Sequence, residues 1–220
     1  MELGDDILGN GRENKELKIN DNIYSKSDAY KTLDMVNMWI GNVDSKISYS
    51  LTFIGVLLGF FLTTKKPIEI SKVANKIVKK IGEIYSTGIQ VVLKDIEFKD
   101  IISVIILVLI CIVIFTSVRA VIYLYKGIKG KINPEVYNER GLVTSSNIFW
   151  NSISNQKYNE FYKNISGLKK NELIKDISSQ IFINSNICTE KFENYNKGVK
   201  YIVISVIIFF IYTILGYIFI

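Results

Sequence analysis

The sequence predicts an all-α membrane protein with three transmembrane helices, two of them extended as long cytoplasmic helices, and a small helical cytoplasmic subdomain. Hydrophobic residues make up 49% of the 220-residue chain, and they are concentrated in three blocks, at 47–64, 101–125 and 201–220. Each block approaches the roughly 20 apolar residues that a helix needs to cross a bilayer. Only a helix satisfies its own backbone polar groups in hydrocarbon, so all three blocks are predicted to be helices.

The first predicted helix begins near Asp28 and continues without interruption into the 47–64 span, and Pro67 marks its end. A proline disfavours helical geometry in the residue before it. Residues 1–29 before this helix are polar, with few apolar side chains, and we expect a flexible N-terminal arm there. Residues 71–93 carry apolar and lysine side chains on different faces of a helix. Such a helix either lies on a membrane surface or packs on the protein's own water-facing part.

The second span is predicted to run to about Gly130, with Asn133 and Pro134 marking its exit. A small helical subdomain is expected over 135–170. Asn171 is a residue type favoured as a helix N-cap, and the last predicted helix runs from there through Gly198 into the 201–220 span. Residues 30–220 then form one transmembrane domain, with 126–200 as its cytoplasmic part.

Composition argues against catalysis. The chain has no histidine, which is the commonest general base and metal ligand at neutral pH. Its two cysteines, Cys111 and Cys188, lie far apart and predict no disulfide framework. Phosphate-binding loops, nucleophile elbows and metal-ligand clusters are missing from the sequence. We therefore expect no enzyme activity, no cofactor, no metal and no nucleic acid duplex as partner.

Three polar motifs keep a fixed order relative to the spans. The first is the LDMVNMWIGNVDSKISYSLTFIGVLLGF stretch of 33–60, the second is SSNIFW at 145–150, and the third is QIFINSNICTEKF at 180–192. Together they resemble the Pycsar effector transmembrane family of bacterial antiphage proteins. The matching residues of the first motif are Val36, Asn37, Trp39, Ile40, Asp44, Lys46, Gly55 and Gly59.

The resemblance implies a membrane-disrupting or channel-forming effector that arrests or kills the infected cell. It also implies a multi-pass protein of the bacterial inner membrane with a cytoplasmic N-terminus, although the lysines of 65–99 count against that orientation. The implied partners are the lipid bilayer, further copies of the chain, and a cyclic or oligo-nucleotide messenger made by a partner cyclase or nucleotidyltransferase. The alternative is a membrane-anchored interaction or scaffold subunit without pore activity.

Polar residues occupy helix stripes where a buried surface requires apolar side chains. Asn37 and Asp44 share a heptad stripe with Leu33, Ile40 and Ile47, and Asn184 and Lys191 do the same on the last helix. We call the following set the polar seam: Asn37, Asp44, Lys46, Gln180, Asn184 and Lys191. It is either a network that couples signal to spans, with Asp44 paired to Lys191, or a solvated face.

Two further groups are candidates for binding and assembly. Trp39, Phe149, Trp150 and Lys157 would suit stacking of a nucleotide base or contact with a partner, or else simple packing. Arg119 lies inside the second span, where it either lines a pore or interface or extends its charge to the bilayer surface. Gly55 and Gly59 form a G-x-x-x-G pair, which permits close contact between helices.

Overall fold

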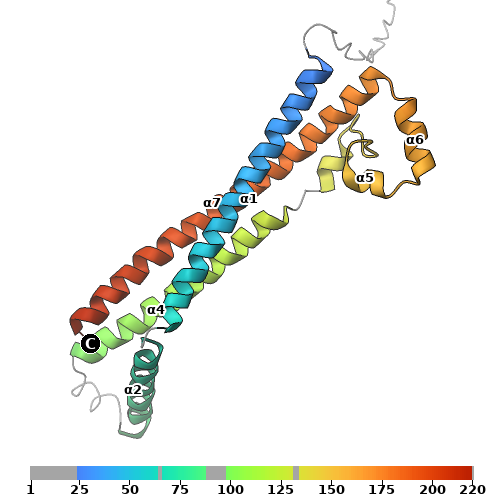
Figure 1. Cartoon of the computed structure of the whole chain (residues 1–220). Helices are drawn as coiled ribbons and strands as arrows, with labels where there is room; N and C mark the ends of the chain where they lie inside the picture. The colour runs from blue at the N-terminus through green and yellow to red at the C-terminus, as the bar shows by residue number, and fades with distance from the viewer. Residues whose placement is uncertain (1–23, 64–65, 88–97, 131–133, 220) are drawn as a thin grey trace, which may run out of the picture.

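Three long helices form the body of the molecule in the computed structural model, which describes residues 24–63, 66–87, 98–130 and 134–219. Helix α1 (Lys26–Thr63), helix α4 (Phe98–Lys129) and helix α7 (Lys170–Phe219) lie side by side in all views (Figure 1). Helices α1 and α7 run in the same direction and α4 runs against both. All three are long and apolar enough to cross a membrane, and the described residues contain no strand, so the predicted fold class is confirmed.

Helix α1 begins at Lys26, two residues before the predicted start, because Ser25 and Asp28 form a capping box. The Asp28 backbone N–H donates to Ser25 Oγ at 3.2 Å, and the Ser25 N–H donates back to Asp28 Oδ2 at 3.0 Å. The Ser25 hydroxyl also donates to Asp28 Oδ2 at 2.7 Å, and this bond, with the smaller effect of the Ser25 N–H, holds the pKa of the Asp28 carboxyl below its ordinary value. The predicted N-terminal arm therefore overlaps the helix at residues 26–29, and its first 23 residues lie outside the described residues.

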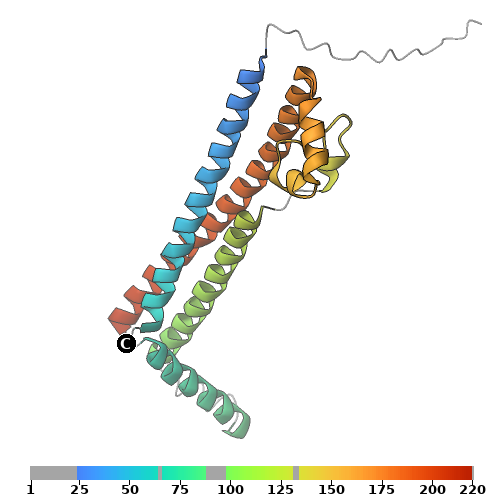
Figure 2. The ribbon, with the colours of Figure 1, turned by 45° about the vertical axis from the view of Figure 1, so that its right-hand side comes forward.

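Helix α2 (Lys66–Thr87) follows α1 at the end of the bundle where α1 and α7 finish, which we call the apolar end. It points away from the three long helices (Figure 2). Pro67 is its second residue, where a proline is tolerated because the first N–H groups of a helix have no intrahelical partner. The predicted amphipathic helix of 71–93 thus begins five residues earlier, and residues 88–93 lie outside the described residues. Val78 and Ile81 on it are 67% and 50% exposed, whereas Ile77 is partly buried.

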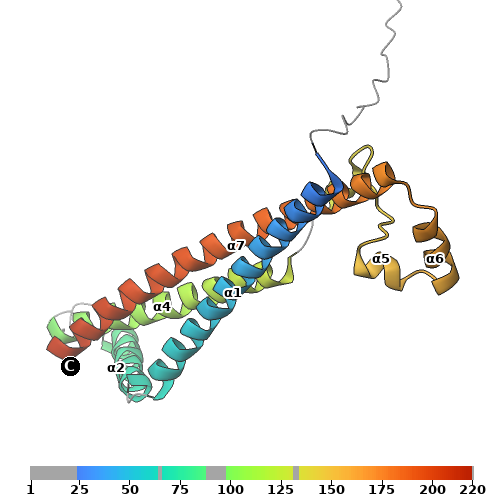
Figure 3. The ribbon, with the colours of Figure 1, turned by 45° about the horizontal axis from the view of Figure 1, so that its top comes forward.

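A small arm sits beside the other end of α7 (Figure 3). It consists of a 3-10 turn (Pro134–Asn138), helix α5 (Trp150–Ser154) and helix α6 (Tyr158–Ser166). Helix α7 begins at Lys170, so Asn171 lies inside the helix and is not its N-cap. The Glu172 carboxylate provides the cap instead, accepting a hydrogen bond from the Lys169 N–H at 2.9 Å.

Two clusters of buried side chains join the long helices. Near the middle of the molecule, Val43 and Ile47 from α1 meet Ala120 and Leu124 from α4. Toward the apolar end, α4 and α7 pack through a second cluster made of Ile102, Ile106, Ile110 and Tyr212. Most of the remaining apolar side chains of the spans point outward: only 17% of the most apolar window is buried in α1 and in α7, and 33% in α4.

Candidate functional site

Helices α1 and α7 are joined by two polar contacts in the half of the bundle farther from α2. We call each contact a polar rung. In the first rung, Asn184 Nδ2 donates to Asn37 Oδ1 at 2.8 Å. In the second, the Lys191 ammonium lies 2.6 Å from Asp44 Oδ1. Each rung joins residues 147 positions apart in the sequence, and the two rungs are one heptad apart on each helix. This is the register of two parallel helices that pack along their heptad stripes.

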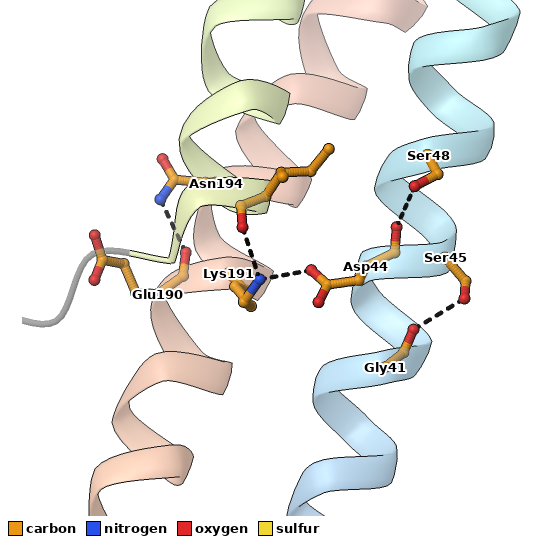
Figure 4. A network of polar contacts seen from close by, with 8 residues as sticks. Gly41, Asp44, Ser45, Ser48, Glu190, Lys191 and Asn194 are labelled. Carbon is orange, nitrogen blue, oxygen red and sulfur yellow. Dashed lines mark hydrogen bonds and ion pairs between the residues drawn. The ribbon is translucent and has the colours of Figure 1, made fainter. Parts of the chain in front are cut away.

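The second rung also includes α4. Lys191 Nζ donates to the backbone carbonyl of Ile128 at 3.1 Å (Figure 4). That carbonyl is among the last four of α4, which have no partner within the helix and carry its partial negative charge. We call the contact of Asp44, Lys191 and the Ile128 carbonyl the three-helix junction, because it includes one group from each spanning helix.

Burial at the junction is unequal. The Lys191 side chain is 7% exposed, whereas that of Asp44 is 42% exposed. An ammonium out of water needs oxygen acceptors to offset its lost hydration, and here it has two. The apolar blocks of the sequence place the junction close to the expected bilayer boundary, because Asp44 comes three residues before the first block and Ile128 three residues after the second.

Glycines allow the helices to approach closely around the junction. A Cβ atom on Gly127 would lie 2.8 Å from Ile47 Cδ1, and one on Gly130 would lie 2.9 Å from Lys191 Cε. Gly130 also has a φ of +51°, which favours glycine. Further along α7, a Cβ on Gly198 would lie 2.7 Å from Leu124. Sequence reasoning missed these contacts because no local pattern distinguishes these glycines from others.

The other seam residues have different surroundings. The Lys46 ammonium lies over the Phe192 ring at 5.7 Å, and Trp39 packs on the same ring at 6.5 Å. These aromatic side chains line a shallow groove of about 400 Å³ between α1 and α7, which also holds Cys188. Burial raises the pKa of the Cys188 thiol above its ordinary value, so the thiol is protonated at neutral pH.

Gln180 is buried near the start of α7, close to residues that form hydrogen bonds with the segment containing the SSNIFW motif. Asp176 Oδ2 accepts the Asn147 N–H at 2.8 Å, and Ser179 Oγ accepts the Val143 N–H at 3.0 Å. Sequence reasoning missed Asp176 and Ser179, although their spacing places them with Gln180 on one face of α7. The buried polar groups on this face anchor the arm to α7.

The predicted base-stacking group is not gathered into one site. Phe149 and Trp150 contact one another at 5.7 Å on the arm, whereas the ring contact of Trp39 is with Phe192 on α7. Lys157 is the exposed residue that precedes α6. A role of these residues in binding stays a prediction.

The two assembly candidates also differ from one another. Arg119 lies beside the stacked rings of Tyr123 and Tyr201, with Cζ 5.3 and 5.6 Å from their centroids, and donates to the Tyr123 hydroxyl at 3.1 Å. A Cβ added to Gly55 or Gly59 would meet nothing within 4 Å. Among the described residues, Gly55 thus has no close neighbour from another helix, and a contact of the G-x-x-x-G pair with another copy stays a prediction.

These features define a three-span membrane protein whose two parallel helices are joined to the third by a polar junction at the bilayer boundary. The model of the Pycsar effector protein domain matches residues 81–218. The Pycsar effector protein GmPycTM of Gulbenkiania mobilis is 36% identical over 186 residues, which cover 84% of this chain and 90% of the relative. No solved structure matches. The chain belongs to the Pycsar effector family, and it is a transmembrane effector of antiviral defence.

The domain match also bears on the resemblance seen in the sequence. Its second and third motifs, at 145–150 and 180–192, lie inside the matched residues, whereas the first motif, at 33–60, precedes them. Both polar rungs join a residue of the first motif to a residue of the third. The motif before the domain match is therefore packed against the matched part of the chain.

Proposed function

We propose that this effector makes the bacterial inner membrane permeable, as a homo-oligomer, when a cyclic or oligo-nucleotide messenger reaches its water-facing part. The messenger would come from a partner cyclase or nucleotidyltransferase, and growth of the infected cell would stop. The chain acts without enzyme chemistry: it changes the packing of its spans. Its N-terminus and residues 126–200 face the cytoplasm, where the messenger is made.

The observation that carries this proposal is the three-helix junction. It lies between the water-facing helices and the spans, so a change on the cytoplasmic side reaches all three spans through one ammonium group. The Lys191 ammonium is buried with two oxygen acceptors. It can leave this position only if other groups, or water, replace them. Such an arrangement favours two alternative packings over a continuous range, which is the property that a ligand-driven switch requires.

Several copies are needed because three helices are too few to enclose a water-filled path. The low burial of the spans supports assembly, since exposed apolar side chains such as Phe53, Phe115 and Ile207 can face either lipid or another copy. Gly55 on α1, where an added Cβ would meet nothing within 4 Å, leaves room for such a contact. Native mass measurement in mild detergent should therefore show a homo-oligomer. A strictly monomeric particle that still kills cells would argue against a pore.

The direct test is dye release from liposomes that contain the purified full-length chain. Addition of cyclic pyrimidine mononucleotides should start release, and Asp44→Ala should abolish the response. Asp34→Ala is the matched control, because Asp34 is an exposed carboxylate on the same helix. Intact liposomes with a wild-type protein that binds messenger would favour the scaffold alternative, in which the chain only recruits a partner.

Topology is tested separately by reporter fusions. A reporter fused after Lys197 should be active only in a cytoplasmic form, and one fused near Ser86 in α2 only in an external form. Both reporters on the same side would contradict a three-span chain with the N-terminus in the cytoplasm.

A further inference from the structure

A second polar site lies on the face of α7 away from α1. It is a groove of about 450 Å³ between the last turn of α4 and the middle of α7. Lysines from both helices line it: Lys126 and Lys129 from α4, and Lys197 from α7, with Asn194 between them. We call it the basic groove. Figure 4 shows Glu190 and Asn194 on the side of α7 that faces away from Asp44.

The charges in the basic groove favour a small anion with a single charge. Three lysines stand against two glutamates, Glu190 and Glu193, which leaves one net positive charge. Lys197 has Glu193 at 3.7 Å, but both side chains are more than half exposed, so this pair is weak. Lys126 is held over the Tyr123 ring at 5.6 Å. The partial negative charge at the end of α4 is already countered by Lys191, which binds the Ile128 carbonyl.

The position of the basic groove points to a group found at the membrane surface. Lys126 follows directly on the second apolar block, and Lys197 precedes the third by four residues. Tyr125 lines the groove, and Tyr123 and Tyr201 stack on one another one turn further toward the bilayer, with ring centroids 5.5 Å apart. Tyrosine and lysine side chains in this arrangement are typical of the headgroup layer.

We propose that the basic groove binds a phosphodiester monoanion. This group carries one negative charge at neutral pH, in contrast to a phosphomonoester with nearly two. Two sources supply it here: the headgroup of a membrane phospholipid, and a cyclic mononucleotide. The groove volume lies within the range of small-molecule sites. The bound oxygens accept hydrogen bonds from Lys126, Lys129 and Lys197, and Glu190 and Glu193 favour a headgroup that also carries an ammonium.

Occupation of the basic groove acts on the junction through shared backbone. Lys129 follows Ile128, whose carbonyl binds Lys191, and Glu190 precedes Lys191. A ligand that draws Lys129 and Lys197 together therefore shifts the two segments that meet at the junction. Binding itself does not require pore formation, so a negative dye-release result and a negative binding result are separate outcomes.

The test uses the full-length chain in mild detergent, with native mass spectrometry to detect retained ligand. The probes are phosphatidylethanolamine, phosphatidylglycerol and cyclic uridine monophosphate, each titrated alone. The variant Lys126→Gln/Lys129→Gln should bind the probe that the wild type retains about 30-fold more weakly, because it loses two lysine–phosphate contacts. The matched control is Lys163→Gln/Lys169→Gln, which removes two exposed lysines, one from α6 and one next to the start of α7. Lys126→Arg/Lys129→Arg keeps the charges and should retain binding.

Each outcome decides the proposal. Loss of lipid retention only in Lys126→Gln/Lys129→Gln identifies a phospholipid site, and selective loss of cyclic nucleotide binding identifies a nucleotide site. Unchanged binding of every probe overturns the proposal. An equal loss in the control also overturns it, because general electrostatic attraction would then explain the binding. A melting temperature unchanged from that of the wild type shows that a loss does not come from unfolding.

Discussion

Removing either side chain of the Asp44–Lys191 pair should destabilise the bundle, but by different amounts. Asp44→Ala leaves the Lys191 ammonium, which is 7% exposed, with the Ile128 carbonyl as its acceptor. Breaking a fully buried pair costs roughly 3–5 kcal/mol. Here water can reach the space left by a half-exposed carboxylate, so we expect about 2–3 kcal/mol.

Lys191→Met should cost less. It removes the buried charge and keeps an unbranched side chain beside Gly130, while the Asp44 carboxylate, 42% exposed, is hydrated. The loss is then that of ordinary hydrogen bonds, about 0.5–1.5 kcal/mol. The difference of about 1.5 kcal/mol corresponds to a melting temperature roughly 3–6 °C lower for Asp44→Ala than for Lys191→Met in a chain of this length.

Thermal unfolding in mild detergent, followed by circular dichroism, measures this difference. Asp34→Ala and Lys200→Met are the controls, because both remove exposed charges from the same two helices. Equal melting temperatures for Asp44→Ala and Lys191→Met, or a lower one for Lys191→Met, would refute the reasoning. The ammonium would then be hydrated in the folded protein, and the pair would be a surface ion pair.

The same variants test the coupling role in cells. Asp44→Ala and Lys191→Ala should both abolish cell killing while the protein still inserts into the membrane. Exchange of the two charges in Asp44→Lys/Lys191→Asp should restore activity only in part, because an aspartate at 191 cannot donate to the Ile128 carbonyl. Full toxicity of both single variants at equal expression would show that the junction does not couple signal to spans.

Three further predictions concern other positions. Gly127→Ala should lower the melting temperature, because the new Cβ would lie 2.8 Å from Ile47, whereas Gly55→Ala has open space and should raise helix stability by up to about 1 kcal/mol; equal effects would contradict the close approach. Asn184→Ala should change stability by no more than about 1 kcal/mol, since its bond to Asn37 is exposed, so loss of killing without loss of stability would identify a signalling role. The lowered pKa of Asp28 stabilises the start of α1 above the ordinary aspartate pKa and ceases to do so as the pH falls through the folded value, so amide exchange in the first turn should accelerate there, and Asp28→Asn should remove this pH dependence.

The sequence predicted the spans, and it offered the Asp44–Lys191 pair as one of two interpretations of the polar seam, because both depend on repeats along one chain. Apolar blocks of bilayer length specify helices. Asn37 and Asp44 lie seven positions apart on the first helix, and Asn184 and Lys191 lie at the same interval on the last helix. Two parallel helices that match one such pair must match the other, which fixes the register before any coordinates are known.

Contacts that depend on which helix lies opposite were not predictable. The G-x-x-x-G pair of α1 fits the rule for close packing better than Gly127 does. A Cβ on Gly127 would nevertheless lie 2.8 Å from Ile47, whereas one on Gly55 would meet no described atom within 4 Å. Similarly, Asn171 is a better N-cap residue than Lys169, but the Glu172 carboxylate caps α7 from inside. In both cases tertiary contacts, and not local preference, decide the outcome.

The uninterrupted course of α7 has a mechanical consequence. With 50 residues in one uninterrupted helix, it is about 75 Å long. Lys191 lies roughly 32 Å along α7 from the end next to the arm and roughly 42 Å from the apolar end, so its contact can act as a pivot point. A tilt of about 10° around this point would displace the apolar end by roughly 7 Å. The same tilt would move the arm-side end by roughly 5.5 Å, so a movement of the arm would reach the far end of α7 slightly enlarged and close to the 8–10 Å distance between packed helices.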